Sequence, residues 1–329
     1  MALINAEVRQ SNEALLKCLT SNDGAVKKEA ADMVTDYLRL KNREDGFARK
    51  ILPPQTITSA NLDRQVDTPD PVVVIDMEAE SAGAYTIPFA TGPLTQAIEA
   101  GRYAVFLKRI ASKRYQSDVA RLMTWNMDIR QMLKDFLLKD IQTTEDKGFM
   151  ATVTRIVGEV NTVNPAVEAC QWITAGPLDR VSLAHARKGL PSTNKRLNAT
   201  VGLINNITIW DIPALDRIEI GGDLAEKLFL DGEAPGKVMG LDLIVTIKNE
   251  LVADHDLYQF ADPKYTGNFL VMEDITLSTE NINYFIEFFG YEMVGAAIRN
   301  VAAVCKTSFT DSAMDWRTGK ARGSETNIS

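Results

Sequence analysis

The stretch SDVARLMTWNMDIRQMLKDFLLKDIQTTED, residues 117–146, determines the expected fold. Its apolar residues recur every three or four positions, as in a helix with one buried side: Leu122, Trp125, Ile129, Met132, Leu133, Phe136, Leu137 and Ile141. Ser117 is the expected N-cap, and Gly148 is the expected stop signal. A helix of about thirty residues is roughly 45 Å long, so it needs a large surface to pack against.

The composition is that of a globular protein with a sizeable core: 329 residues, 45% of them hydrophobic and 24% charged. The net charge of −8 argues against a surface that grips nucleic acid or an anionic membrane. Cys18, Cys170 and Cys305 have no paired spacing, so they indicate neither a zinc site nor a disulfide framework. No apolar stretch has the length of a signal peptide core or a membrane span, and we expect neither.

Residues 1–65 read as an N-terminal arm. Asn22 or Asp23 can cap a helix whose apolar side carries Val26, Ala30, Val34 and Leu38. Such a helix buries too little apolar surface to be stable alone, so we expect it to dock on its own domain or on a neighbouring copy. Pro53 and Pro54 interrupt the helical pattern, and residues 51–70 read as a linker.

Residues 71–106 read as extended chain, with strands at 72–75, 84–89 and 103–107. Between residues 65 and 101 there are six acidic residues and no Lys or Arg: Asp67, Asp70, Asp76, Glu78, Glu80 and Glu99. A basic block follows directly, opposed only by Asp118: Arg102, Lys108, Arg109, Lys113, Arg114 and Arg121.

Either block alone is typical of a solvated charged face. Two adjacent blocks of opposite sign also suit an acidic hairpin that lies across a basic surface of another copy. The candidate assembly interface therefore consists of Asp67, Asp70, Asp76, Glu78, Glu80, Lys108, Arg109, Lys113, Arg114 and Arg121.

The chain after the long helix alternates between strand and helix patterns and predicts an α+β fold. Strands are predicted at 151–163, 203–212, 241–247, 269–276, 284–289 and 294–305, and helices at 177–187 and 223–230. Residues 254–260 read as a polar loop and edge, and residues 310–329 as a flexible tail.

The sequence offers little that points to catalysis. His185 and His255 are its two histidines, and neither has ligands at metal-binding spacing, so a surface position is favoured for His185. Residues 254–256 (DHD) lack the glycine and terminal Glu of a calcium loop. Residues 232–237 (GEAPGK) are one residue short of a phosphate loop, and Val238 replaces its Ser or Thr. We expect no catalytic residue, cofactor or metal, which favours a structural protein over an enzyme.

The order of these parts resembles that of tailed-bacteriophage major capsid proteins, whose Hong Kong ninety-seven-like fold is shared with encapsulin shells. GRYAVFLKRI at 101–110 resembles the strand that leaves the extended loop of that family. KVMGLDLIVTIKNEL at 237–251 resembles a segment of its axial domain in which a glycine precedes a strand. YQFAD at 258–262, followed by GNFL at 267–270, resembles the loop after that segment. Residues 282–305, with Arg299, resemble its closing strands.

The resemblance implies a division of the chain. After the N-terminal arm come an extended loop at 66–107, a peripheral domain at 108–165 with a spine helix at 117–146, and an axial domain at 166–272. Residues 273–309 return to the peripheral domain, and 310–329 form the tail. The family also implies hexamers and pentamers that close into an icosahedral shell around double-stranded DNA, made in the host cytoplasm and located in the virion.

Two departures from the family bear on assembly. The extended loop has no Lys, so the resemblance implies a shell without isopeptide crosslinks. The arm is too short for a scaffolding extension of domain size, so a separate scaffolding protein is implied, beside a portal protein and a possible decoration protein. Two alternatives stay open: an encapsulin-like compartment that packages another cargo, and a cytoplasmic α/β enzyme with a site near Asp254, His255 and Asp256.

Overall fold

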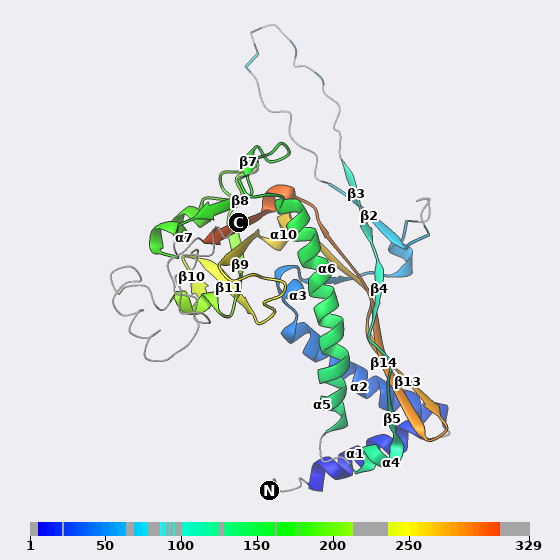
Figure 1. The fold of residues 1–329 in the computed structure, drawn as a ribbon. Helices are drawn as coiled ribbons and strands as arrows, with labels where there is room; N and C mark the ends of the chain where they lie inside the picture. Colours follow the sequence, from blue (N-terminus) through cyan, green and yellow to red (C-terminus); the bar gives the residue numbers. More distant parts are fainter. Residues whose placement is uncertain are drawn as a thin grey trace, which may run out of the picture.

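The structure is a computed structural model. It describes residues 6–21, 23–63, 69–77, 101–124, 128–161, 163–176, 178–212 and 236–309, with the single positions 86, 87, 89, 92 and 95. Figure 1 shows an elongated molecule in which a long helix, α6, has one sheet along its side and a second sheet at its upper end. Of the helices within these ranges, none is long and apolar enough to cross a membrane.

The helices are α1 Ala6–Leu19, α2 Gly24–Asp45, α3 Phe47–Ile51, α4 Val119–Met123, α5 Ile129–Leu133, α6 Lys139–Val157, α7 Arg180–Arg187 and α10 Pro263–Thr266. A π-helical turn, Lys134–Leu138, joins α5 to α6, and short 3-10 turns lie at Ser59–Asn61, Thr208–Asp211 and Val301–Ala303. The two-stranded pieces are β2 Val72–Asp76 with β3 Arg102–Phe106, and β6 Val163–Asn164 with β7 Ala169–Cys170.

The five-stranded sheet is built on one long antiparallel hairpin, β13 Gly267–Ile282 and β14 Phe285–Ile298. β1 Pro54–Thr56 pairs with β13, while β4 Lys108–Ala111 and β5 Tyr115–Asp118 pair with successive parts of β14. The strands predicted at 269–276 and 284–289 are therefore fragments of much longer strands. Their full length is possible because each is paired along most of its course.

The six-stranded sheet has the order β10-β11-β9-β12-β15-β8. Its strands are β8 Trp172–Ala175, β9 Ala199–Asn205, β10 Lys237–Val238, β11 Leu241–Thr246, β12 Asp256–Ala261 and β15 Val304–Phe309. Successive side chains point to opposite faces, so Leu203 and Tyr258 pack towards α6 while Ile204 and Leu257 pack towards α7. The sheet is thus covered by helix on both faces.

Three sequence predictions about this sheet were wrong. Residues 254–260 are not a polar edge: β12 is buried along its whole length and lies between β9 and β15. Burial of the polar start of β12 is possible because Asp256 forms an ion pair with Lys306, with Oδ2 and Nζ 2.7 Å apart. The strand predicted at 203–212 ends at Asn205, and the one predicted at 294–305 is divided between β14 and β15.

The predicted helix at 117–146 is displaced along the chain. Residues 115–118 form strand β5, and Asp118 rather than Ser117 caps the short helix α4, accepting the N–H of Ala120 at 2.8 Å. The long rod begins at Ile129 and ends at Val157. The π-helical turn changes the phase of the apolar stripe, so Phe136 is half exposed and contacts Tyr115, with ring centroids 5.6 Å apart.

Gly148 lies inside α6 and does not end it. The helix continues because Phe149, Met150, Val153 and Val157 extend its buried side into the core, which corrects the strand predicted at 151–163. Gly158 ends it with φ +72°, a left-handed conformation that favours glycine, and its N–H donates to the carbonyl of Thr154. Tertiary packing here outweighs the local propensity of a glycine.

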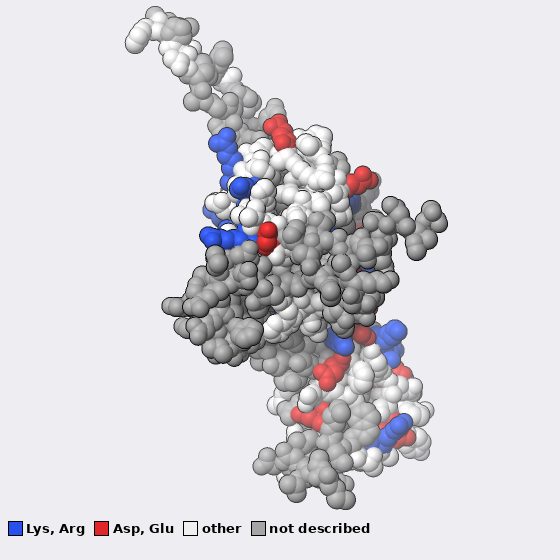
Figure 2. Space-filling model, turned by 60° about the vertical axis from the view of Figure 1, so that its left-hand side comes forward, with Lys and Arg blue, Asp and Glu red and all other residues white. Residues whose placement is uncertain are grey.

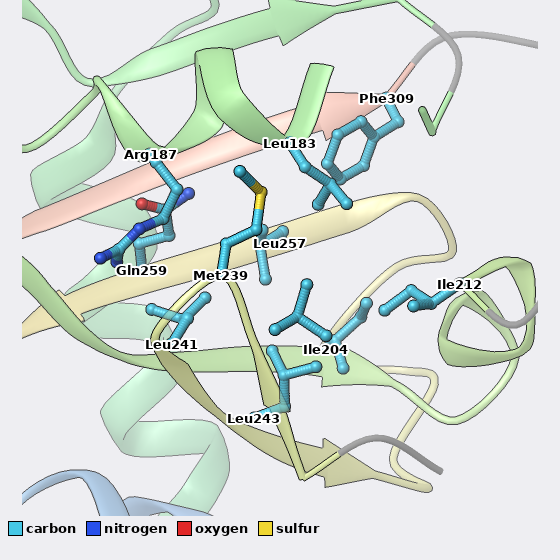
Figure 3. Close-up of a pocket in the computed structure, with 11 residues that line it drawn as sticks. Leu183, Arg187, Ile204, Ile212, Met239, Leu241, Leu243, Leu257, Gln259 and Phe309 are labelled. Atoms are coloured by element: carbon cyan, nitrogen blue, oxygen red, sulfur yellow. The ribbon is translucent and has the colours of Figure 1, made fainter. Parts of the chain in front are cut away.

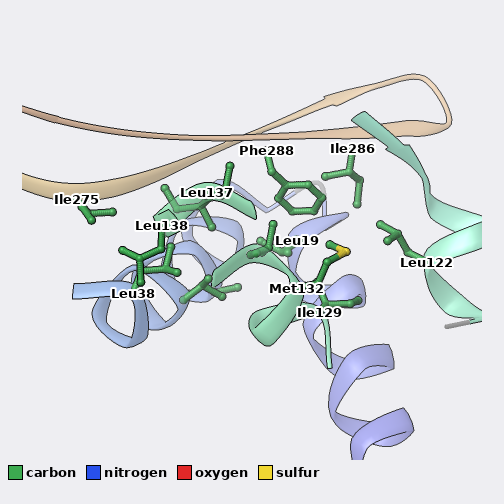
Figure 4. Packing of buried hydrophobic residues seen from close by; sticks show 14 of the residues in the cluster. Leu19, Leu38, Leu122, Ile129, Met132, Leu137, Leu138, Ile275, Ile286 and Phe288 are labelled. Atoms are coloured by element: carbon green, nitrogen blue, oxygen red, sulfur yellow. The ribbon is translucent and has the colours of Figure 1, made fainter. Parts of the chain in front are cut away.

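The arm docks on its own chain. Asp23 caps α2 as predicted, accepting the N–H of Ala25 at 2.9 Å. Figure 4 shows helices of the arm and of the rod packed beneath the β13–β14 hairpin. The arm contributes Leu16, Leu19, Ala30, Val34 and Leu38, which meet rod and hairpin residues that include Ile129, Leu137, Ile275 and Phe288. Each fully buried Leu contributes about 1.5–3 kcal/mol, enough in sum to hold the two helices in place.

Three sequence predictions lie outside the described residues, wholly or in large part: the strand at 84–89, the helix at 223–230 and the tail at 310–329.

Candidate assembly interface

The base of the extended loop is a short antiparallel ribbon of β2 and β3, from Val72 opposite Phe106 to Asp76 opposite Arg102. One face of the ribbon is buried: Val73 and Val105 pack with Leu107 and Leu270. Gly295 of β14 allows this close approach, since a Cβ there would lie 2.7 Å from the carbonyl oxygen of Phe106. The β2–β3 ribbon at the base of the loop is therefore fixed to the hairpin.

The acidic candidates lie on this ribbon or beyond it. Asp70 and Asp76 are exposed, and Asp76 Oδ1 is 2.8 Å from Arg102 Nε on the opposite strand. Asp67, Glu78 and Glu80 lie outside the described residues. Asp76 is thus partly neutralised within its own hairpin, which the sequence analysis did not anticipate.

The basic candidates lie along the free edge of the five-stranded sheet. Lys108 and Arg109 are exposed on the edge strand β4, Lys113 follows it, and Arg121 is exposed on α4. Charged side chains also keep an edge strand from pairing with other chains, so this placement alone has a second explanation. Figure 2 shows Lys and Arg beside Asp and Glu towards the lower end of the molecule in that view.

Arg114 differs from the other basic candidates because it has ion-pair partners among the described residues of its own chain. Its Nη1 lies 3.5 Å from carboxylate oxygens of both Glu280 and Glu287, and its guanidinium carbon lies 4.8 Å from the ring centroid of Phe289. The group is more than half exposed, so these contacts are screened by water. Arg114 is therefore the basic candidate whose charge is most offset by carboxylates of its own chain.

Exposed apolar side chains add to the charged residues, and the sequence analysis missed them. Tyr284 is 79% exposed at the tip of the β13–β14 hairpin, flanked by the partly exposed Ile282 and Phe285. Phe89, on the loop, is fully exposed. Aromatic side chains in such positions are typical of protein contacts. In the sequence, the signal for this hairpin tip is Asn283, followed directly by the aromatic residues Tyr284 and Phe285. Asn283 has φ +55°, a backbone conformation that is common in tight turns.

A buried ionic cluster connects the arm to the rest of the molecule. Arg49 of α3 binds Glu145 of α6 through two bonds, Nε to Oε1 at 3.1 Å and Nη2 to Oε2 at 3.0 Å. Its Nη2 also lies 2.7 Å from Glu292 Oε2 on β14, and its Nη1 lies 3.1 Å from Asp274 Oδ1 on β13. One guanidinium thus joins three elements.

The residues of the enzyme alternative have structural partners. Asp256 accepts the Ser308 hydroxyl at 2.7 Å in addition to its ion pair with Lys306. His255 has φ +70°, and its N–H donates to the Thr208 hydroxyl at 2.9 Å, so it forms the tight turn before β12. His185 is exposed, as predicted. Within the described ranges no three His, Cys, Asp or Glu side chains are grouped to hold a metal ion.

A small pocket lies between α7 and the six-stranded sheet, shown in Figure 3. It is lined almost entirely by apolar side chains, among them Leu183, Ile204, Leu257 and Phe309. Its free volume of about 20 Å³ suffices for a water molecule but not for a substrate. The buried amide of Gln259, which has no hydrogen-bond partner among the described residues, lies at its edge. A pocket of this size is a packing defect of the core.

Comparisons with known proteins give a match in structure but none in sequence. A scan against family models finds no match, and neither does a search of curated proteins. The mature capsid of bacteriophage PhiM1 aligns with a TM-score of 0.57 over 82% of this chain and 88% of its own, at 9% identity. The capsid of the cyanophage P-SCSP1u gives the same TM-score and coverage at 13% identity. The chain has the phage capsid fold.

A third solved structure is also similar to this chain in fold. A virus-like particle from Pyrococcus furiosus aligns with a TM-score of 0.52 over 85% of this chain and 100% of its own, at 12% identity. Identities this low show a common fold and not common contacts. The contacts between copies of this capsid-fold protein therefore depend on its own side chains.

Proposed function

We propose that this protein is a major capsid protein, which assembles through hexamers and pentamers into an icosahedral shell around double-stranded DNA. The observation that carries the proposal is the likeness of its fold to phage capsids over about four-fifths of the chain. The ribbon of β2 and β3, which pairs with no further strand among the described residues, supports it, because a two-stranded piece is marginal in isolation and gains order from a neighbour.

The two sheets suit two roles in such a shell. The six-stranded sheet with α7 would be the axial domain, and the five-stranded sheet with the rod would be the peripheral domain. β15 pairs with β12 and β8, so the last described strand belongs with the axial sheet in this scheme rather than with the peripheral return at 273–309. The arm at 1–65, the extended loop at 66–107 and the tail at 310–329 complete the division.

The contact between subunits would pair the acidic loop of one copy with the basic edge of the next. Lys108, Arg109 and Lys113 are exposed on one side of the sheet and offer positive charge to the stretch 65–101, which carries no Lys or Arg. A single exposed ion pair contributes only about 0–1 kcal/mol. A closed shell repeats each contact at every subunit, so small contributions add to a large total.

Partners other than a second copy follow from the same proposal. A separate scaffolding protein and a portal protein would join the shell, as would a decoration protein where the virion has one. The DNA would be held without sequence-specific contacts. The chain would be made in the host cytoplasm and would end in the virion. An acidic chain suits a container that does not bind its DNA tightly.

A second candidate is a shell with a different cargo, and the likeness to a virus-like particle favours keeping it. Nucleic-acid content distinguishes the two. Particles that hold nuclease-protected DNA support the viral shell, and particles that hold a protein cargo support the compartment.

Sedimentation of the purified protein tests the proposal. Over a range of protein and salt concentrations, we expect subunits in equilibrium with assemblies of five or six copies or with closed shells. A homogeneous monomer or dimer under all conditions, also after addition of the scaffolding partner, would contradict a capsid role.

A further inference from the structure

The root of the arm holds an excess of buried negative charge. Arg49 is 5% exposed and contacts three carboxylates, those of Glu145, Asp274 and Glu292. Glu145 is 5% exposed and Glu292 is fully buried. Among the described residues, one positive charge thus faces two buried glutamates and the partly exposed Asp274.

No other described cation compensates for this excess. On α6, Asp146 is next to Glu145, but Lys248 of the segment after β11 is already paired with Asp146. The groups that face Glu292 are then Arg49 from α3, Glu145 from α6 and Asp274 from β13. Ionising both buried glutamates beside one guanidinium is unfavourable, because like charges repel strongly where the dielectric constant is low.

The geometry has a place for one proton. Glu292 Oε2 accepts from Arg49, whereas Oε1 is buried and has no donor among the described residues. Glu145 lies within hydrogen-bonding reach of Glu292. A proton on Glu292 can therefore be donated to Glu145, which satisfies the orphan oxygen and removes one of the two charges.

The pKa shifts of the cluster agree with a proton on Glu292. Burial, and then the charge of Glu145, raises the pKa of Glu292 from 4.5 to about 9. Burial also raises the pKa of Glu145, although Arg49 opposes the rise. Burial alone would lower the pKa of Arg49, but its carboxylate neighbours outweigh that effect and raise it. Arg49 therefore stays charged while Glu292 holds the proton near neutral pH.

A route to solvent exists on one side of the cluster. A cavity of about 320 Å³ is lined by Arg49, Pro54, Thr56, Val271, Met272 and Asp274. The side chain of Asp274 is 19% exposed. Water in this cavity thus reaches Asp274 at the side of the cluster, so protons can exchange with the buried pair without unfolding of the core.

The cluster lies where α3 and β1 of the arm are attached to α6 and β13, so loss of its contacts would release this part of the arm. The N–H of Ala48 donates to Asp146 at 3.0 Å, and β1, just after α3, pairs with β13. We propose that the carboxylate pair Glu145 and Glu292 is a proton-controlled latch, which holds α3 and β1 against the rod and hairpin while it shares a proton and loosens them when that proton is lost. This latch belongs to the single subunit and does not depend on shell formation.

Hydrogen exchange on the unassembled subunit tests the latch. The amides of residues 47–57 are followed between pH 7 and pH 10, with each rate divided by its intrinsic rate at that pH. In the wild type, we expect protection to fall at least tenfold as pH rises. In Glu292→Gln, which keeps a hydrogen-bond donor but cannot ionise, we expect protection to stay within twofold. The matched control Glu287→Gln, on the same strand but outside the cluster, should behave as wild type.

Constant protection in the wild type would overturn the latch, and so would an equal fall in Glu292→Gln. If that variant does not fold, carboxyl carbon shifts of the wild type decide the matter. One buried glutamate that titrates between pH 7 and pH 10 supports the latch, and none that titrates in this range contradicts it. Either result stands whether or not the protein forms shells.

Discussion

At the scale of single residues, Arg49 joins parts of the chain that are far apart in sequence. Its three carboxylate partners lie 96, 225 and 243 residues away in the chain, on α6, β13 and β14. Its guanidinium also lies 5.6 Å from the ring centroid of Phe269. Nothing local in the sequence marks Arg49, since RK at 49–50 reads as an ordinary charged helix end. Partners so distant in sequence can be found only once the fold is known.

Replacement of Arg49 by Ala should lower the free energy of unfolding by about 3–5 kcal/mol, because it leaves buried carboxylates without a counter-charge. The matched control is Arg114→Ala. Its exposed pairs with Glu280 and Glu287 should cost no more than about 1 kcal/mol. Urea denaturation of the unassembled subunit measures both. Equal losses in the two variants would contradict the account of the cluster.

The stability of the subunit should depend on pH through Glu292. Its pKa in the folded protein is raised from 4.5 to about 9, so the native state binds a proton that the unfolded state does not. The stability that this proton contributes is complete below about pH 4.5 and is lost as the pH rises towards 9. Denaturation at successive pH values should show a decline for the wild type and a smaller decline for Glu292→Gln. Parallel curves would be evidence against a proton on Glu292.

At the scale of elements, the rod shows what periodicity can and cannot predict. The apolar stripe from Ile129 to Ile141 correctly predicted a long helix with one buried side. Its boundaries could not be predicted, because Tyr115 to Asp118 find strand partners in β14 and because Phe149 and Val153 extend the buried side beyond Gly148. The strand β12 was mistaken for a loop because its first residue, Asp256, is paired with the distant Lys306 and Ser308, which nothing local in the sequence shows.

Two glycines should respond to alanine in opposite ways. Gly148→Ala should stabilise the subunit by about 0.5–1 kcal/mol, because Gly148 lies in a helix with open space around it. Gly295→Ala should destabilise it by about 1–3 kcal/mol, because the new Cβ would meet the backbone of Phe106. Thermal unfolding measures both changes. A stable Gly295→Ala variant would mean that the base of the loop is not fixed to the hairpin.

At the scale of the whole molecule, the order of the parts could be predicted and the contacts between copies could not. The resemblance in order, from arm to loop to long helix to mixed body, led to the fold that the structure has. The candidate interface residues differ in how far their charges are already paired. Lys108 and Arg109 are exposed on an edge strand, whereas Arg114 and Asp76 have partners in their own chain. Charge in a sequence does not reveal which charges are already paired.

Charge reversal at the sheet edge should weaken assembly. The double variant Lys108→Glu with Arg109→Glu should raise the protein concentration needed for assembly about tenfold, equivalent to about 1.4 kcal/mol per subunit. Lys147→Glu with Lys188→Glu, which makes the same change in net charge at other exposed positions, should assemble as wild type. Light scattering during assembly measures both. An unchanged threshold in the first variant would remove β4 from the interface.

The central claim is that this chain forms a closed shell, and electron microscopy of the purified protein with its scaffolding partner tests it most directly. The account predicts five-fold and six-fold rings or icosahedral particles, in which the loop at 66–107 of each subunit crosses a neighbour. Isolated monomers or dimers in every condition, with the loop in contact with no other copy, would contradict it.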